Sequence, residues 1–151
     1  MKIYDSPQMH TAEHILNQTM VRMFDCGRSF SSHIEKKKSK CDYHFHRDLT
    51  DEEKKEVERR VNAIIEKDLP VSEAFLPVEE ASRLYNLERL PEEEKNPIRI
   101  VKIGDYDACP CIGKHVPSTG VIGSFKFTTV SYSDGVLRVR FKVLPGSEQK
   151  N

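Results

Sequence analysis

The sequence predicts an α+β fold, in which an antiparallel-rich β-sheet packs against two main helices, as a single domain over residues 1–151. Three observations predict it. Two long segments repeat apolar residues at helical spacing, and several short segments are rich in β-branched and aromatic residues, the last two joined by an Asp-Gly turn. A chain of 151 residues with 37% hydrophobic and 32% charged residues also has the size and composition of one globular domain.

The first third of the chain predicts a helix followed by a hairpin. The helix covers residues 8–25 and ends at Gly27, and its apolar face consists of Met9, Ala12, Leu16, Met20 and Met23. Two short apolar runs follow at 30–34 and 41–45. They flank a lysine-rich turn, and this arrangement favours a β-hairpin.

A second helix is predicted to begin at a capping box. The Thr50 side chain can accept a hydrogen bond from an amide of the first turn, and Glu53 stands three residues later. The helix buries Val57, Val61, Ile64 and Ile65 and stops before Pro70.

The remainder of the chain predicts mostly strands. A short helix is expected from Pro77 to Leu84, and the charged, proline-bounded residues 88–97 are expected to form an exposed loop. The last two strands flank Asp134-Gly135, a dipeptide that favours a tight hairpin turn. Strands are expected at 71–75, 98–103, 123–132 and 136–144.

Charge and composition narrow the function classes. The 24 Lys and Arg residues balance the 24 Asp and Glu residues, which argues against a non-specific nucleic-acid binder but allows a local basic patch. No apolar run approaches the roughly 20 residues of a membrane span, and the amino terminus has no apolar signal region. We therefore expect a cytoplasmic protein without a membrane partner. Its four cysteines are then expected to be reduced, which favours metal or catalytic roles over disulfides.

Two pairs of residues have the spacing of metal ligands. His10 and His14 are four residues apart on the first predicted helix, so both imidazoles project from one side. Cys111 and His115 are also four apart, in a segment that Gly113 marks as a turn or loop. Cysteine together with histidine favours zinc, and the four residues could complete a tetrahedron. The pattern differs from that of zincin proteases, because Thr follows the first histidine where those enzymes have Glu.

The spacing leaves several alternatives open. Either pair alone also occurs in proteins that bind no metal, so on spacing alone the metal site is a hypothesis. A catalytic zinc usually keeps one position open, and one of the four ligands would then leave or the shell would expand. Cys109, two residues before Cys111, is either a substitute ligand or a packed thiol beside the site.

These motifs resemble those of the alanyl-tRNA synthetase editing domain and its free-standing relatives, the AlaX proteins. The run from His10 to Leu16 is similar to the family's HTAxHLL, and residues 40–43 lie where the family has Arg-Phe-Asp-Phe. The segment from Cys111 to Lys126 resembles the pattern CGGTHV-x-x-TG-x-IG-x-FK. The resemblance covers about residues 8–143. The editing domain of threonyl-tRNA synthetase is a more distant match.

The resemblance implies a zinc-dependent ester hydrolase that acts in trans on mischarged tRNA. It places the family's four metal ligands on His10, His14, Cys111 and His115. Zinc would either activate water or position the substrate. With only nine residues before His10, and with no aminoacylation domain or separate tRNA-binding domain, the chain resembles the shortest AlaX class.

Two serines are expected to recognise the substrate, although the sequence departs from the family pattern nearby. Ser32 matches the hydroxyl position that helps to read the misattached amino acid, and we expect Ser31 to assist it. Ser31 itself replaces a strand glycine, and Ser29 stands where glutamine is common. Ile112 and Lys114 replace a glycine and a threonine between the downstream ligands.

The leading functional hypothesis is therefore editing of Ser-tRNA(Ala), with Gly-tRNA(Ala) as a second substrate. The alternatives are editing of Ser-tRNA(Thr) and a non-catalytic zinc-containing tRNA-binding module, while the oligomeric state stays open. The expected tRNA contacts are basic residues at a hairpin tip and beside the metal site: Lys36, Lys37, Lys38 and Lys114. The alternative for the lysines of the hairpin tip is that they form only a solvated surface.

Overall fold

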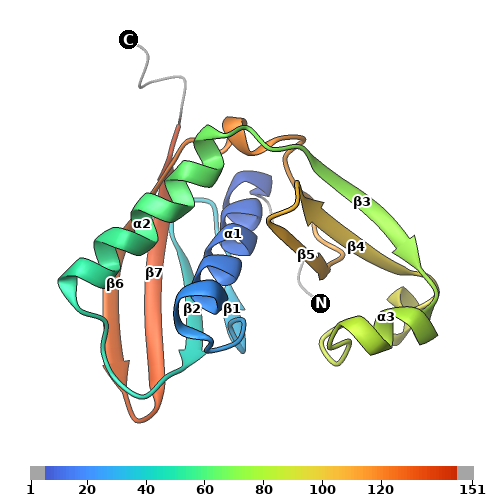
Figure 1. The fold of residues 1–151 in the computed structure, drawn as a ribbon, viewed down its shortest axis with the longest axis horizontal. Helices are drawn as coiled ribbons and strands as arrows, with labels where there is room; N and C mark the ends of the chain where they lie inside the picture. The colour runs from blue at the N-terminus through green and yellow to red at the C-terminus, as the bar shows by residue number, and fades with distance from the viewer. Residues whose placement is uncertain (1–5, 146–151) are drawn as a thin grey trace.

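The strands form two antiparallel sheets in the computed structural model, which describes residues 6–145 (Figure 1). The larger sheet has the order β1-β2-β7-β6, and the smaller one has the order β3-β4-β5. The larger sheet consists of β1 (Ser31–His33), β2 (Ser39–His44), β7 (Val136–Leu144) and β6 (Ser124–Ser133). The smaller sheet consists of β3 (Val71–Leu76), β4 (Ile98–Ile103) and β5 (Asp107–Pro110). The α+β class is confirmed, and the antiparallel strands are shared between two sheets.

Helices α1 (Pro7–Phe24) and α2 (Asp51–Glu66) cover one face of the larger sheet (Figure 1). Helix α1 begins where the Ser6 hydroxyl accepts a hydrogen bond from the Met9 amide, with Pro7 at the first helical position. The predicted capping box of α2 is confirmed, because both of its reciprocal hydrogen bonds are present. The main core lies between these helices and the sheet and includes fully buried Tyr43 and Phe141.

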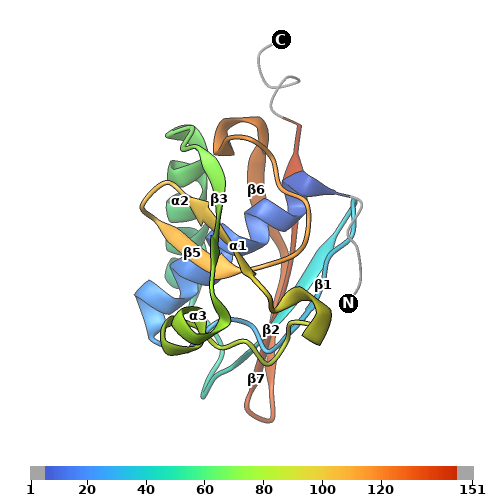
Figure 2. The same ribbon diagram turned by 90° about the vertical axis from the view of Figure 1, so that its right-hand side faces the viewer.

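The smaller sheet has its own apolar cluster beneath α3 (Val78–Leu84), where Ala81 packs against Ile98 and Ile100. This sheet lies beside α1 on the side away from α2 (Figure 1), and it faces the viewer in Figure 2. Strand β5 was not expected from the sequence, because its four residues Asp-Ala-Cys-Pro lack β-branched side chains. It forms because the turn at Gly104 folds it back onto β4, where Asp107 pairs with Ile103.

Two short 3-10 helices were also not expected, η1 (Glu92–Glu94) within the predicted 88–97 loop and η2 (Thr119–Val121) before β6. Helix η2 is held against α2, because the buried Thr119 hydroxyl donates a hydrogen bond to the Ile64 carbonyl (2.8 Å). None of the helices within residues 6–145 has an apolar stretch long enough to span a bilayer.

Candidate metal centre

The first turns of α1 and the loop after β5 bring the four predicted ligands together. His10 and His14 are buried on the side of α1 that faces β5, and their ring centroids are 5.0 Å apart. The His115 ring lies 4.3 Å from that of His10 and 4.4 Å from that of His14. With the Cys111 sulfur, the candidate ligand atoms of all four residues lie within 4.8 Å of one another. Such spacing suits the coordination of one metal ion.

The Nδ1 nitrogen of each imidazole faces an oxygen atom of a neighbouring residue. The His10 Nδ1 lies 3.3 Å from the Lys114 carbonyl, and the His14 Nδ1 lies 3.7 Å from Asp107 Oδ2. The His115 Nδ1 lies 2.9 Å from the Thr11 hydroxyl, which already donates its proton to the Pro7 carbonyl and therefore accepts here. With the proton on each of these Nδ1 atoms, the Nε2 atoms would be the nitrogens that bind a metal.

Cys111 lies at the centre of these imidazoles and is poised as a thiolate. Its sulfur is 3.4 Å from His10 Nε2 and 3.5 Å from His115 Nε2. Burial disfavours the charged form, but hydrogen bonds from the three histidines outweigh burial and lower the pKa of the Cys111 thiol to about 2. Burial also lowers the pKa of His115 to about 4. A thiolate beside a neutral imidazole is the state in which both residues ligate metals.

Gly113 is required by the close approach of the loop to α1. A Cβ atom at this position would lie 2.1 Å from His10 Cε1 and 2.4 Å from His10 Nδ1. The Gly113 backbone cannot easily retreat, because Arg99 donates hydrogen bonds to the carbonyls of both Gly113 (2.9 Å) and Cys111 (2.8 Å). The loop therefore packs on the His10 ring only because position 113 has no side chain.

A second group of possible ligands lies next to the Nδ1 nitrogen of His14. The Cys109 sulfur lies 3.3 Å from His14 Nδ1, and Asp107 lies behind the same nitrogen. Both Asp107 oxygens accept hydrogen bonds from Arg28 (2.7 and 3.3 Å), and Gln18 donates to one of them (2.8 Å). Because Arg28 already neutralises this carboxylate, the group is better suited to orienting His14 than to holding a second cation.

Asp107→Asn is expected to lower the affinity for Zn²⁺ by roughly 10- to 100-fold, the usual effect of losing a partner behind a metal-bound histidine. The amide cannot hold both the His14 Nδ1–H and the Arg28 guanidinium as the carboxylate does. Titration against a chromogenic chelator measures the affinity. Asp105→Asn, at an exposed position two residues away, is the matched control and should leave the affinity unchanged.

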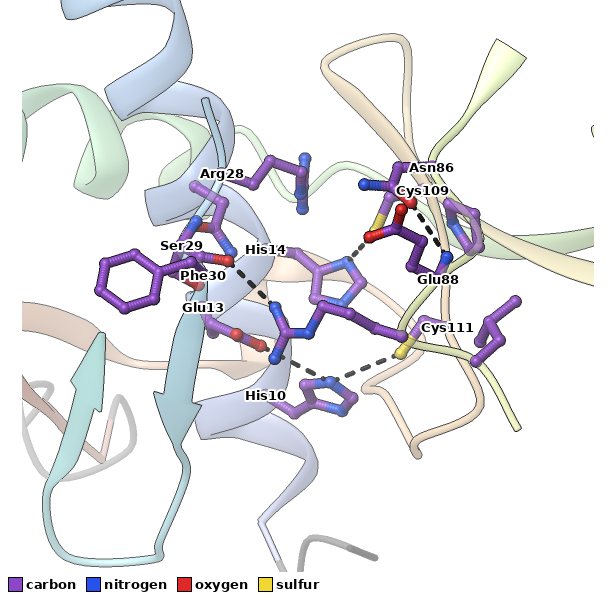
Figure 3. Close-up of a pocket in the computed structure, with 14 residues that line it drawn as sticks. His10, Glu13, His14, Arg28, Ser29, Phe30, Asn86, Glu88, Cys109 and Cys111 are labelled. Carbon is purple, nitrogen blue, oxygen red and sulfur yellow. Dashed lines mark hydrogen bonds and ion pairs between the residues drawn. The ribbon is translucent and has the colours of Figure 1, made fainter. Parts of the chain in front are cut away.

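A cavity of about 540 Å³ opens beside the cluster (Figure 3). Glu13 and Asn17 of α1 line it next to the histidines, and Glu13 Oε1 lies 3.6 Å from His10 Nε2. One wall consists of Arg28, Ser29 and Phe30, and the opposite wall consists of Asn86, Glu88, Arg89 and Leu90. The walls are joined where the Arg89 guanidinium donates a hydrogen bond to the Ser29 carbonyl (3.0 Å).

The two serines that were expected to recognise the substrate lie close to the cavity but outside its lining. Neither Ser31 nor Ser32 lines the cavity, whereas the buried Ser29 does. The Ser29 and Ser32 hydroxyls form a hydrogen bond of 2.7 Å, and Ser32 also contacts the Cys41 sulfur at 3.7 Å. Ser32 therefore lies behind Ser29 as seen from the metal centre.

The predicted basic contacts lie in two places. Lys36, Lys37 and Lys38 are exposed in the turn between β1 and β2. Lys114 is exposed within the metal-site loop, where its backbone carbonyl holds His10.

Sequence reasoning did not identify Thr11, Asp107 or residues 86–90 as parts of the site. Thr11 stands between the two histidines and Asp107 four residues before Cys111, so polar residues close to predicted ligands were the available signal. Residues 86–90 carry no such signal, because they reach the cavity only through the packing of the smaller sheet beside α1.

Comparison with known proteins identifies the family of the chain. Residues 98–149 match the family described as threonyl and alanyl tRNA synthetase second additional domain. The chain is 35% identical over 133 residues to alanine–tRNA ligase of Treponema denticola, and the aligned region covers 87% of this chain and 22% of the ligase. It is 36% identical over 139 residues to alanine–tRNA ligase of Methanopyrus kandleri, covering 87% of this chain and 15% of the ligase. The chain thus spans about a fifth or less of the length of these relatives.

Proposed function

Because this chain belongs to the threonyl and alanyl tRNA synthetase second additional domain family and is homologous to a portion of alanine–tRNA ligases, we propose that it deacylates mischarged tRNA. The proposed substrate is Ser-tRNA(Ala), with Gly-tRNA(Ala) as a second substrate, and the proposed site of action is the cytoplasm. The observation that carries the proposal is the cluster of buried His10, His14 and Cys111 with half-buried His115, of which the first three line a cavity.

The proposed cofactor is zinc, held by the Nε2 atoms of the three histidines and by the Cys111 thiolate. Three imidazoles and one thiolate suit zinc better than calcium or magnesium, which prefer oxygen ligands. With one ligand released or the shell expanded, a bound zinc would lower the pKa of a coordinated water or position the substrate and polarise its carbonyl oxygen.

The residues of the chain supply the rest of the chemistry. Hydrolysis of an aminoacyl ester consumes one water and releases the amino acid and the tRNA 3′ hydroxyl. The Glu13 carboxylate borders the cavity beside His10, where it can hold the attacking water and accept its proton. The 540 Å³ cavity has room for an amino acid and the terminal ribose, and its lining residues next to the cluster, His10, Glu13 and His14, are buried.

We assign recognition of the substrate hydroxyl to the Ser29–Ser32 pair, with Ser29 facing the cavity and Ser32 orienting it. A synthetase pocket built for a small apolar side chain rejects an added hydroxyl by only about a hundredfold, so a second site that binds the hydroxyl adds the missing discrimination. Ser31, outside the cavity lining, would act only through its neighbours.

Ser29→Ala and Ser32→Ala are expected to slow hydrolysis of Ser-tRNA(Ala) by about 2- to 10-fold, the value of one neutral hydrogen bond. Glycine has no hydroxyl, so hydrolysis of Gly-tRNA(Ala) by the same variants should be unchanged and serves as the internal control. Equal losses on both substrates would remove the pair from hydroxyl recognition.

The experiment that tests the function is deacylation by the purified, zinc-loaded protein of Ser-tRNA(Ala), Gly-tRNA(Ala), Ser-tRNA(Thr) and Ala-tRNA(Ala). Rapid loss of serine from tRNA(Ala), with Ala-tRNA(Ala) spared, is the expected result. Preferential hydrolysis of Ser-tRNA(Thr) would reassign the substrate. Zinc-loaded protein that binds tRNA but hydrolyses none of these esters would contradict the enzymatic proposal and favour a binding module.

A further inference from the structure

The outward face of the larger sheet carries a concentration of positive charge. Helices α1 and α2 cover the inner face, so alternate residues of each strand point away from them (Figures 1 and 2). On β2, β6 and β7 these outward positions carry five cations and one acid, Asp42. The five cations, which we call the basic face, are Lys40, Lys126, Arg138, Arg140 and Lys142.

Two cross-strand pairs on the basic face place like charges directly opposite each other. Lys40 of β2 is the register partner of Arg140 of β7, and Lys142 of β7 is the partner of Lys126 of β6. Directly opposed like charges destabilise an antiparallel pair, whereas opposite charges would stabilise it. The free protein therefore carries repulsion here that a bound anion would relieve.

The one acid on this face, Asp42, neutralises only part of this charge. Asp42 accepts two hydrogen bonds from Arg138 (2.9 and 3.0 Å) and lies 3.4 Å from Lys40. Within residues 6–145, Lys126, Arg140 and Lys142 form no ion pair. The whole chain has a formal net charge of zero, so this excess is local and the rest of the surface is correspondingly acidic.

The basic face continues around edge strand β1 into the turn between β1 and β2. The turn between β1 and β2 holds Lys36, Lys37 and Lys38, and Ser39 after it pairs with Phe141 between Arg140 and Lys142. At the other end of β1, the chain leads back to Phe30 and Ser29 in the cavity wall. Cations are thus placed across the outer face of the larger sheet and in the turn that follows its edge strand, β1.

We propose that the basic face binds the phosphate backbone of an RNA, with the lysine turn as its continuation around β1. Resting on the proposed function, that RNA is the tRNA whose aminoacylated 3′ end enters the cavity. The spread of cations over three strands fits a polyanion that extends across several phosphates, since each neutralised phosphate releases a counterion. Phosphate contacts of this kind position a nucleic acid without reading its sequence.

The test uses the triple variant Lys126→Gln, Arg140→Gln and Lys142→Gln, with binding of uncharged tRNA(Ala) measured by fluorescence anisotropy over a range of salt. We expect tRNA binding to weaken at least tenfold at low salt. The magnitude of the slope of log K against log salt should fall by about 2–3, because each phosphate contact contributes roughly 0.7–0.9. The melting temperature should stay equal or rise, since the substitutions remove two like-charge pairs. A variant that was simply misfolded would instead melt lower.

The matched control removes three exposed cations elsewhere, with Lys55→Gln, Lys67→Gln and Arg83→Gln. Equal tRNA affinity and salt slope for the two triple variants would overturn the proposal, as would binding to phosphatidylserine vesicles but not to tRNA. Because uncharged tRNA is the probe, the result is independent of catalysis. Salt-sensitive binding through the basic face without hydrolysis would refute only the enzymatic function, and hydrolysis without such binding would refute only the basic face.

Discussion

Gly113→Ala is expected to lower the affinity for Zn²⁺ and the rate of deacylation by about a hundredfold or more, at or above the upper end of effects from residues that position metal ligands. The added Cβ would overlap the His10 ring at 2.1 Å, and Arg99 anchors the carbonyls of the loop. The overlap is therefore relieved by moving His10 away from Cys111, which opens the cluster. Chelator competition measures the affinity, and single-turnover deacylation measures the rate.

Gly135→Ala is the matched control for this substitution. Gly135 lies in the β6–β7 turn at φ +82°, where alanine is strained but a Cβ meets nothing within 4 Å. We expect this variant to lose some stability and to keep its metal affinity. Wild-type zinc affinity in Gly113→Ala would show that His10 is not held against the loop as described.

Cys111→Ala is expected to abolish the stabilisation of the protein by zinc and to reduce deacylation to the uncatalysed rate. The thiolate lies at the centre of the cluster, within 3.5 Å of two imidazole nitrogens. For the wild type, free zinc at 100 times its dissociation constant stabilises the folded state by about 2.7 kcal/mol, a rise of roughly 5–10 °C in Tm. Differential scanning fluorimetry with and without zinc measures the shift.

Cys26→Ala is the control, because this half-buried thiol lies outside the cluster and its sulfur donates hydrogen bonds to the backbone carbonyls of Met20 and Gly27. It should retain the full zinc-dependent shift. Cys109→Ala separates the two interpretations of Cys109. A packed thiol behind His14 predicts a retained but smaller shift, and a true ligand predicts the same loss as Cys111→Ala.

Local patterns in the sequence predicted most of the helices and strands because the forces that form them act between near neighbours. The Thr50 and Glu53 capping box starts α2 through contacts within one turn, and the Asp134-Gly135 turn sets the hairpin of β6 and β7. Strand β5 and the division into two sheets depend on pairing and packing across long sequence separations. Asp107 and Cys109 become strand residues only by pairing with β4, and no local sequence pattern predicts this pairing.

The candidate site likewise combines features that the sequence predicts with features that only the fold creates. The paired spacings of His10 with His14 and of Cys111 with His115 exist in the sequence, and the fold brings the two pairs within reach of one metal. The roles of Ser29 and Ser32 could not be separated from the sequence, because Ser29 precedes β1 and no local pattern tells which hydroxyl meets a cavity formed by distant residues. The basic face could not be predicted either, since its cations come from β2 and from the β6–β7 hairpin, which lie far apart in the chain.

The central claim is that one zinc ion is held by three histidine nitrogens and the Cys111 sulfur. X-ray absorption at the zinc edge of the purified protein tests it most directly. We predict one zinc per chain with three nitrogen neighbours at about 2.0–2.1 Å and one sulfur at about 2.3 Å. Two sulfur neighbours would place Cys109 in the shell, and a shell of oxygen alone, or no stoichiometric zinc, would contradict the account.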